Sequence, residues 1–276
     1  MMVGVHNKPT AVRWIGHILI GTLCLLVLFP LYWMVVTSIR PQGDFFASSL
    51  LPSSVTLEHY AYVLNHLPLG RLFVNTAVMA VVRTVAQVLI GLLAGYAFAR
   101  WDFFGKRALF TLFTFTWLVP QQVTMIPNYV LMSQLGWLNS LAGMIVPSMV
   151  STFAMILLFQ QIKGFPHDLI DAARVDGGTS WMILWRVIVP NLRAMLASLV
   201  ILQFIGAWND YFWPLLVSNR METGVLQLGL QGFFTQEGDL WGPMMAAATL
   251  TALPIFIIYV LLQRQVVDSF VKSGLR

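Results

Sequence analysis

Long hydrophobic runs, separated by short polar stretches, cover most of this chain. An α-helix needs about 20 apolar residues to cross the hydrocarbon core of a bilayer, and six runs reach that length. We expect membrane-spanning helices at about residues 14–38, 72–99, 108–131, 140–162, 194–217 and 241–263. The pattern predicts an all-α, polytopic membrane protein in which residues 1–276 pack as one domain.

The first run is expected to be a retained helix and not a cleavable signal sequence. Trp14 to Ser38 is 25 residues long and has no formal charge, whereas the apolar core of a signal sequence spans roughly 7–15 residues. A small-residue cleavage pattern of the Ala-x-Ala kind does not follow this run.

The uncharged stretch from Ala108 to Ile162 is too long for one span. Turn-forming residues at Gly136, Asn139 and Ser140 divide it, which predicts a helical hairpin. Three prolines inside the stretch predict kinks that partner helices accommodate: Pro120, Pro127 and Pro147.

Composition excludes a water-soluble protein. Hydrophobic residues make up 58% of the chain and charged residues only 10%, whereas a soluble domain carries about 25% charged residues. Most of the surface must therefore face lipid or partner subunits. The net charge of +5 is spread between the hydrophobic runs, which fits a membrane protein and argues against nucleic acid as a partner.

The sequence predicts no catalytic residue, no metal site and no cofactor bound by this chain. Its single cysteine, Cys24, excludes an intrachain disulfide. The five histidines are too scattered to form a metal or acid–base cluster. A Gly-x4-Gly-Lys-Ser/Thr phosphate loop is absent, so ATP and Mg²⁺ must be held by another chain.

Basic residues are distributed unequally between alternate loops, which predicts the orientation. Twelve lie on the side of the two termini: Lys8, Arg13, Arg100, Lys106, Arg107, Lys163, Arg174, Arg186, Arg193, Arg264, Lys272 and Arg276. Three lie on the other side: Arg40, Arg71 and Arg220. This bias places both termini in the cytoplasm and two long loops, about 39–71 and 218–240, outside.

The polar stretch 163–193, between the fourth and fifth spans, predicts two short helices joined by a sharp turn. Asp168 is expected to cap the first helix, with Asp171 in the capping-box position. Gly177 lies where that helix would end in a left-handed turn. Thr179 can cap a second helix that runs toward Pro190. Two small residues on the first helix, Ala172 and Ala173, leave room for another protein to approach closely.

The same stretch resembles the EAA loop of permease subunits in binding-protein-dependent ABC importers. The family pattern is Glu-Ala-Ala, three residues, Gly, nine residues, then Ile-x-Leu-Pro. Here the pattern is Asp171-Ala172-Ala173, Gly177 and Val187-Ile188-Val189-Pro190, with Asp in place of Glu and Val in place of Ile and Leu. The alternative is an ordinary interfacial linker. The resemblance implies that the following residues couple to an ATPase: Asp168, Asp171, Ala172, Ala173, Arg174, Asp176, Gly177 and Pro190.

Other segments are similar to carbohydrate permeases of the maltose-importer class, in particular to the smaller permease. They are residues 94–100, 118–120 and 208–216, whereas the C-terminal 270–276 departs from the usual Gly-rich ending. The resemblance covers roughly residues 14–276. It implies a second permease subunit, two ATP-binding cassette subunits, an extracytoplasmic solute-binding protein and the bacterial inner membrane. A sugar is the expected solute, glycerol-3-phosphate is the alternative within this class, and a secondary transporter is the alternative outside it.

Arg83 and Asp210 are the only charged residues within the expected spans. A charge in lipid is costly, so each should face the bundle interior, water or a partner. Three hypotheses remain open: independent interfacial positions, contact with the substrate, or an ion pair between the second and fifth spans.

Polar and aromatic residues near these charges are candidates for a substrate pathway. Neutral hydrogen-bonding groups and aromatic faces suit a sugar, although the amides can instead satisfy backbone groups freed by prolines and the aromatics can form an interfacial belt. The candidates are Arg83, Gln121, Gln122, Asn128, Trp208, Asn209, Asp210 and Tyr211.

The outer loop 218–240 is the expected contact with the binding protein. The resemblance implies that this loop reaches toward the sugar cleft, and its glycines would allow a close backbone approach. The candidate contacts are Gly229, Gln231 and Gly232. The alternative is a flexible linker.

Overall fold

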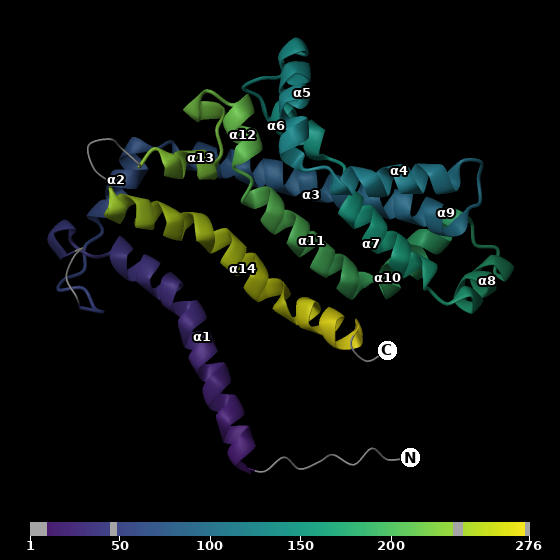
Figure 1. Ribbon diagram of the computed structural model, residues 1–276, viewed down its shortest axis with the longest axis horizontal. Helices are drawn as coiled ribbons and strands as arrows, with labels where there is room; N and C mark the ends of the chain where they lie inside the picture. The colour runs from purple at the N-terminus through teal and green to yellow at the C-terminus, as the bar shows by residue number, and fades with distance from the viewer. Residues whose placement is uncertain (1–9, 45–48, 234–239, 274–276) are drawn as a thin grey trace. The chain divides into compact units, whose positions relative to one another are not determined.

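The computed structural model describes residues 10–44, 49–233 and 240–273, and within these ranges the regular structure is helical throughout (Figure 1). The all-α prediction is confirmed. The chain divides into two compact units, residues 1–67 with 232–252 and residues 68–231 with 253–276. Each is described by itself, and the packing of the whole chain as one domain stays a prediction.

The first unit contains α1 (Thr10–Ser38), η1 (Gln42–Asp44), α2 (Glu58–His66) and the beginning of α14 (Trp241–Ser273). Arg40, only 1% exposed, organises the connection after α1. Its guanidinium lies 5.1 Å from the centroid of the Trp33 ring and donates to the backbone oxygen of Ser49 at 2.8 Å. The ring Nε2 of His59 lies 2.8 Å from the backbone oxygen of Arg40. The predicted outer loop 39–71 is therefore partly ordered by a buried cation.

The second unit is built around α3 (Leu69–Arg100). The helices α7 (Thr152–Lys163) and α11 (Arg193–Trp208) pack along α3 (Figure 1). Gly95 allows α7 to approach closely, because a Cβ atom there would lie 2.9 Å from the backbone nitrogen of Phe159. Small residues permit such packing between membrane helices. The core beside this contact includes Leu92, Leu158 and Leu199.

Among the described residues, four helices are long and apolar enough to cross a membrane: Trp14–Ser38, Leu69–Arg100, Arg193–Val217 and Trp241–Leu261. Two bent helix pairs raise the number to six if each pair is one span. The first is α4 (Lys106–Leu118) with α5 (Gln121–Gln134). The second is α6 (Leu141–Ile145) and η2 (Val146–Ser148) with α7.

The third expected span is a broken helix and not a kinked one, which corrects the prediction. The axes of α4 and α5 differ by 99°. Pro120 has no N–H to continue α4, and it restricts the preceding Val119 to an extended conformation; Val119 has φ −75° and ψ 120°. By contrast, Pro127 lies inside α5.

The predicted hairpin between the third and fourth spans is present. Gly136 and Asn139 have φ values of 68° and 57°, and the hydroxyl of Ser140 accepts a hydrogen bond from the backbone of Gly143 at 3.2 Å.

The fifth span is interrupted near its expected outer end. Residues 209–211 separate α11 from α12 (Phe212–Val217). Two short elements, η4 (Met221–Thr223) and α13 (Leu226–Gln231), follow α12.

Candidate functional site

The segment between α7 and α11 forms the predicted helix, turn and helix. It consists of α8 (His167–Val175), α9 (Ser180–Met182), the π-helix η3 (Ile183–Ile188) and α10 (Val189–Asn191). We call residues 167–191 the coupling segment. Figure 1 shows α8 at the end of the second unit where α3 ends, away from α12 and α13.

The turn after α8 is a left-handed helix ending at Gly177, as predicted. Gly177 has a φ of 81°. Its N–H donates to the backbone oxygen of Arg174 at 3.0 Å, and the N–H of Gly178 donates to that of Ala173 at 2.8 Å. These two bonds define a Schellman motif, which fixes the direction of the chain after a helix. A Cβ atom on Gly178 would lie 2.6 Å from the Ala173 oxygen, a constraint that the sequence analysis missed.

Two details of α8 differ from the prediction. Pro166 and not Asp168 occupies the N-cap position, and no side chain caps the helix; a proline before a helix already fixes the entering backbone. Asp171 therefore forms no capping box, and its Oδ1 lies 3.4 Å from Nη1 of Arg174 at an exposed position. Ala173 is half-buried against the core of its own subunit. Only Ala172 of the two alanines lies on the exposed face.

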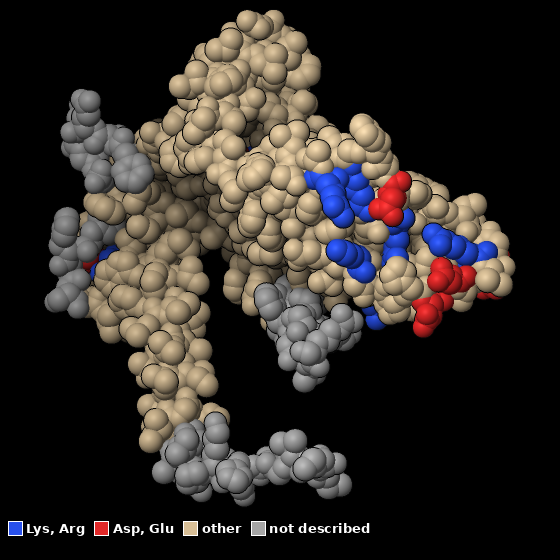
Figure 2. All heavy atoms as spheres, turned by 45° about the vertical axis from the view of Figure 1, so that its right-hand side comes forward, with Lys and Arg blue, Asp and Glu red and all other residues tan. Residues whose placement is uncertain are grey.

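The exposed face of α8 combines apolar and acidic side chains. Leu169 is 49% exposed and Val175 is 88% exposed, and Ala172 lies between them on the helix. Three exposed carboxylates flank these residues: Asp168, Asp171 and Asp176. Figure 2 shows charged side chains gathered at this end of the second unit. Such a face can pack against an apolar cleft that has a basic rim.

The second half of the coupling segment begins with the predicted cap and then continues as a π-helix. The Thr179 hydroxyl accepts from the Met182 N–H at 3.3 Å. Pro190 cannot donate a helical hydrogen bond, and its ring would collide with the carbonyl of Arg186 in a regular α-helix. The chain instead forms the π-helix η3, in which the N–H of Val189 donates to Leu184.

Two residues of α3 attach the coupling segment to the helix bundle. The Tyr96 hydroxyl donates to the backbone oxygen of Ser180 at 2.9 Å. Arg100 donates to the backbone oxygen of Ile162 at 3.2 Å and lies 3.4 Å from Nδ1 of His167. Sequence reasoning missed both roles, although Tyr96 and Arg100 belong to the quoted segment 94–100. A displacement of α8 or α9 would therefore act directly on α3.

Arg83 and Asp210 form an ion pair, which excludes the hypothesis of two independent positions and leaves contact with the substrate a prediction. Nη1 of Arg83 donates to Oδ2 of Asp210 at 2.6 Å. The two side chains are 8% and 13% exposed. The pair joins the middle of α3 to the break between α11 and α12, so it connects two spans.

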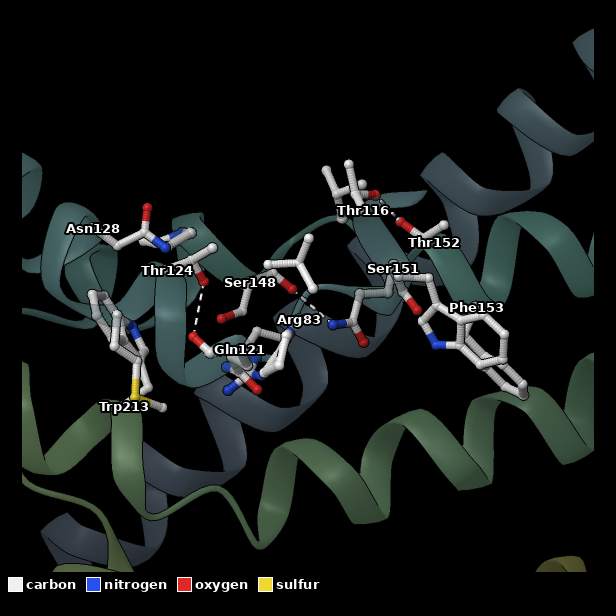
Figure 3. A pocket seen from close by; sticks show the side chains of 17 residues that line it. Arg83, Thr116, Gln121, Thr124, Asn128, Ser148, Ser151, Thr152, Phe153 and Trp213 are labelled. Atoms are coloured by element: carbon white, nitrogen blue, oxygen red, sulfur yellow. Dashed lines mark hydrogen bonds between the residues drawn. The ribbon is translucent and has the colours of Figure 1, made fainter. Parts of the chain in front are cut away.

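A polar pocket of about 500 Å³ lies beside Arg83, at the break between α4 and α5 (Figure 3). Figure 3 shows Thr124 and Asn128 toward one end of the pocket, Thr116 and Phe153 toward the other, and Arg83 between them. Three of the sequence candidates line this pocket: Arg83, Gln121 and Asn128. Their role in a substrate pathway stays a prediction.

The other pathway candidates do not line the pocket. Trp208 is 1% exposed and packs against Phe204, with ring centroids 5.5 Å apart, so it offers no free aromatic face. Asn209 accepts from Gln227 at 3.3 Å, and Tyr211 donates to Gln231 at 2.7 Å. Gln122 is exposed on α5 outside the pocket, and Asp210 pairs with Arg83 without lining the pocket.

Sequence reasoning missed most of the pocket lining. The residues Ser148, Ser151 and Thr152 flank the break between η2 and α7. Gln87 lies one helical turn from Arg83 and donates to the backbone oxygen of Ser148 at 2.7 Å. Two sequence features could have indicated these residues: Pro147 directly precedes Ser148, and Gln87 lies one helical turn from Arg83 on the same helix.

The described part of the loop 218–240 is anchored to α3. The side chain of Asn75 on α3 donates to the backbone oxygen of Gly224 at 2.9 Å, and the Thr76 hydroxyl accepts from the N–H of Leu226 at 2.9 Å. Gly229 is buried, which removes it as a surface contact, whereas Gln231 and Gly232 are exposed. Residues 234–239 lie outside the described residues.

Relatives of known role are similar in sequence over almost the whole chain. The arabinooligosaccharide transport permease AraQ of Halalkalibacterium halodurans is 28% identical over 95% of this chain and 96% of its own length. The sn-glycerol-3-phosphate transport permease UgpE of Yersinia pestis is 29% identical over 93% and 95%. The diacetylchitobiose uptake permease NgcG of Streptomyces coelicolor is 26% identical over 95% and 88%.

The fold is also that of a solved transporter chain. A chain in the crystal structure of a bacterial ABC transporter for the import of alginate has a TM-score of 0.81 and 23% identity, with 95% of this chain and 99% of that chain covered.

The broken spans and the coupling segment define a helical permease of the importer type. Residues 87–272, more than half of the chain, match the family model of binding-protein-dependent transport system inner membrane components. The chain belongs to this family.

Proposed function

We propose that this chain is one of two permease subunits of an ATP-driven importer that moves a sugar delivered by an extracytoplasmic binding protein. The observation that carries the proposal is the coupling segment. Its Schellman turn and its exposed apolar face with acidic flanks form a stiff projection that one of the two ATPase subunits can engage through a basic socket. Family membership favours this function over a secondary transporter.

The distribution of basic residues supports an orientation with both termini and the coupling segment in the cytoplasm. ATP binding would draw the ATPase subunits together and displace α8. Because Tyr96 and Arg100 bind the segment to α3, the displacement would reach the helix that carries Arg83. The permease would then alternate between inward-open and outward-open states.

Sugar is the proposed solute because two of the relatives carry arabinooligosaccharides and diacetylchitobiose. Glycerol-3-phosphate is the second candidate, since the UgpE relatives are equally similar. Both candidates use the same machinery.

Purified alone, the chain is expected to hydrolyse no ATP, because it lacks a phosphate loop. ATP-dependent uptake of radiolabelled arabinotriose, diacetylchitobiose or glycerol-3-phosphate should appear only in proteoliposomes that hold the second permease, the ATPase and the binding protein. Each component is omitted in turn as the control. Hydrolysis by the isolated chain that scales with its purity would contradict the importer.

A photo-crosslinker at position 231 is expected to capture the binding protein in the ATP-trapped complex. Gln231 is exposed at the end of α13, and hydrogen bonds between α3 and the backbone of Gly224 and Leu226 hold the loop in place. The control position is Phe104, which is fully exposed at the opposite end of α3. Equal capture from positions 231 and 104, or none from 231 in a verified complex, would remove this contact.

A further inference from the structure

The pocket beside Arg83 is lined by neutral hydrogen-bonding groups. Gln87 donates to Ser148, and the Ser151 hydroxyl accepts from Gln203 at 2.6 Å, so these side chains form a fixed wall. The side-chain amides of Gln121 and Asn128 have no hydrogen-bond partner among the residues that the structure describes. Each amide offers a donor and an acceptor, the combination that sugar hydroxyls require.

Aromatic rings complete the lining. Trp117 and Phe153 lie toward the Thr116 end of the pocket, with ring centroids 6.2 Å apart. The apolar faces of sugar rings pack on such side chains while their hydroxyls bind amides. The volume of about 500 Å³ lies in the range of small-molecule sites, about 300–1,000 Å³.

The electrostatics of the pocket select against anions. Arg83 is the only ionisable residue among those that line it within the described chain. Its charge is compensated by Asp210 at 2.6 Å. An anionic solute would have to displace the Asp210 carboxylate from Arg83 or enter beside it without a cation of its own, and either step opposes the attraction within the pair.

We propose that this pocket is a solute-binding site on this subunit, that it takes a neutral sugar, and that the Arg83–Asp210 pair excludes anionic solutes. This inference rests on the proposed function and decides between its two solute classes. The first turn of α5 has no side-chain cap, so its free N–H groups can also attract an anion. The test therefore includes an anionic solute, glycerol-3-phosphate.

The assembled importer, without its binding protein, is placed in nanodiscs and titrated with tritiated arabinotriose, diacetylchitobiose and glycerol-3-phosphate. We expect saturable binding of at least one neutral sugar and none of glycerol-3-phosphate. Gln121→Met should weaken sugar binding about fivefold to tenfold, the effect of one lost hydrogen bond. The matched control is Gln134→Met, at the other end of α5 and outside the pocket. Asp210→Asn should allow glycerol-3-phosphate to bind, since it leaves Arg83 uncompensated.

Three results would overturn the inference: no neutral sugar binds, the two glutamine variants behave alike, or the wild type binds glycerol-3-phosphate as tightly as sugar. A pocket filled by the second permease would give the first result. If Asp210→Asn does not fold, the glutamine pair and the wild-type selectivity still decide the question. ATP-dependent uptake by the same complex with its binding protein tests the proposed function separately, because uptake can persist when this pocket binds nothing.

Discussion

Gly177→Val is expected to reduce ATP-dependent uptake about tenfold or more and to release the ATPase subunits, while the chain still inserts into the membrane. The φ of 81° at Gly177 is one that β-branched residues rarely adopt, and forcing it costs about 1–3 kcal/mol. The variant can avoid this cost only by opening the turn, which changes the angle between α8 and α9. Co-purification of the ATPase and uptake in proteoliposomes measure both effects.

Two controls separate backbone strain from a general effect of substitution. Gly177→Asn should retain most docking, because asparagine tolerates the left-handed conformation and a Cβ atom there meets nothing within 4 Å. Val175→Ile should retain docking, because isoleucine keeps a β-branched apolar side chain at this 88% exposed position of the α8 face and leaves the turn backbone unchanged. Full docking and uptake by Gly177→Val would mean that the coupling segment is an ordinary connector.

The coupling segment was predictable because its geometry depends on local sequence. A glycine at a helix end and a threonine three residues before a free N–H each favour one backbone arrangement in any context. Asp168 was placed wrongly for a similar reason. Pro166 fixes the backbone that enters α8, and this local preference won over the capping preference of aspartate.

The pocket was only partly predictable because it depends on where three broken helices meet. Gln121 and Asn128 could be proposed from their prolines, but Ser151 and Phe153 join them only through the 41° bend between η2 and α7. Trp208 shows the opposite error. A tryptophan beside Asn209 suggested a sugar contact, yet its position on α11 directs it into the core with Phe204.

Arg83→Leu is expected to destabilise the helix bundle strongly. It would leave the Asp210 carboxylate, 13% exposed, without its cation. An uncompensated buried charge costs about 3–5 kcal/mol. Asp210→Leu should cost a similar amount, because the Arg83 guanidinium would be left without its carboxylate. The Nε atom of Arg83 is already buried without a hydrogen-bond partner among the described residues. Thermal unfolding in nanodiscs and uptake measure both variants.

The double variant Arg83→Leu/Asp210→Leu should be more stable than either single variant. Removing both charges removes the desolvation cost together with the attraction, and two leucines suit an apolar contact between α3 and the α11–α12 break. Residues in direct contact show coupling free energies of about 0.5–3 kcal/mol, and the 2.6 Å distance places this pair in direct contact. Strictly additive losses would show that the two charges act independently. The double variant should also recover folding and still bind no glycerol-3-phosphate, because its pocket lacks the uncompensated cation that Asp210→Asn exposes. Glycerol-3-phosphate binding by Asp210→Asn but not by the double variant would then trace the effect to the uncompensated Arg83 guanidinium, which a purely structural role for the pair does not predict.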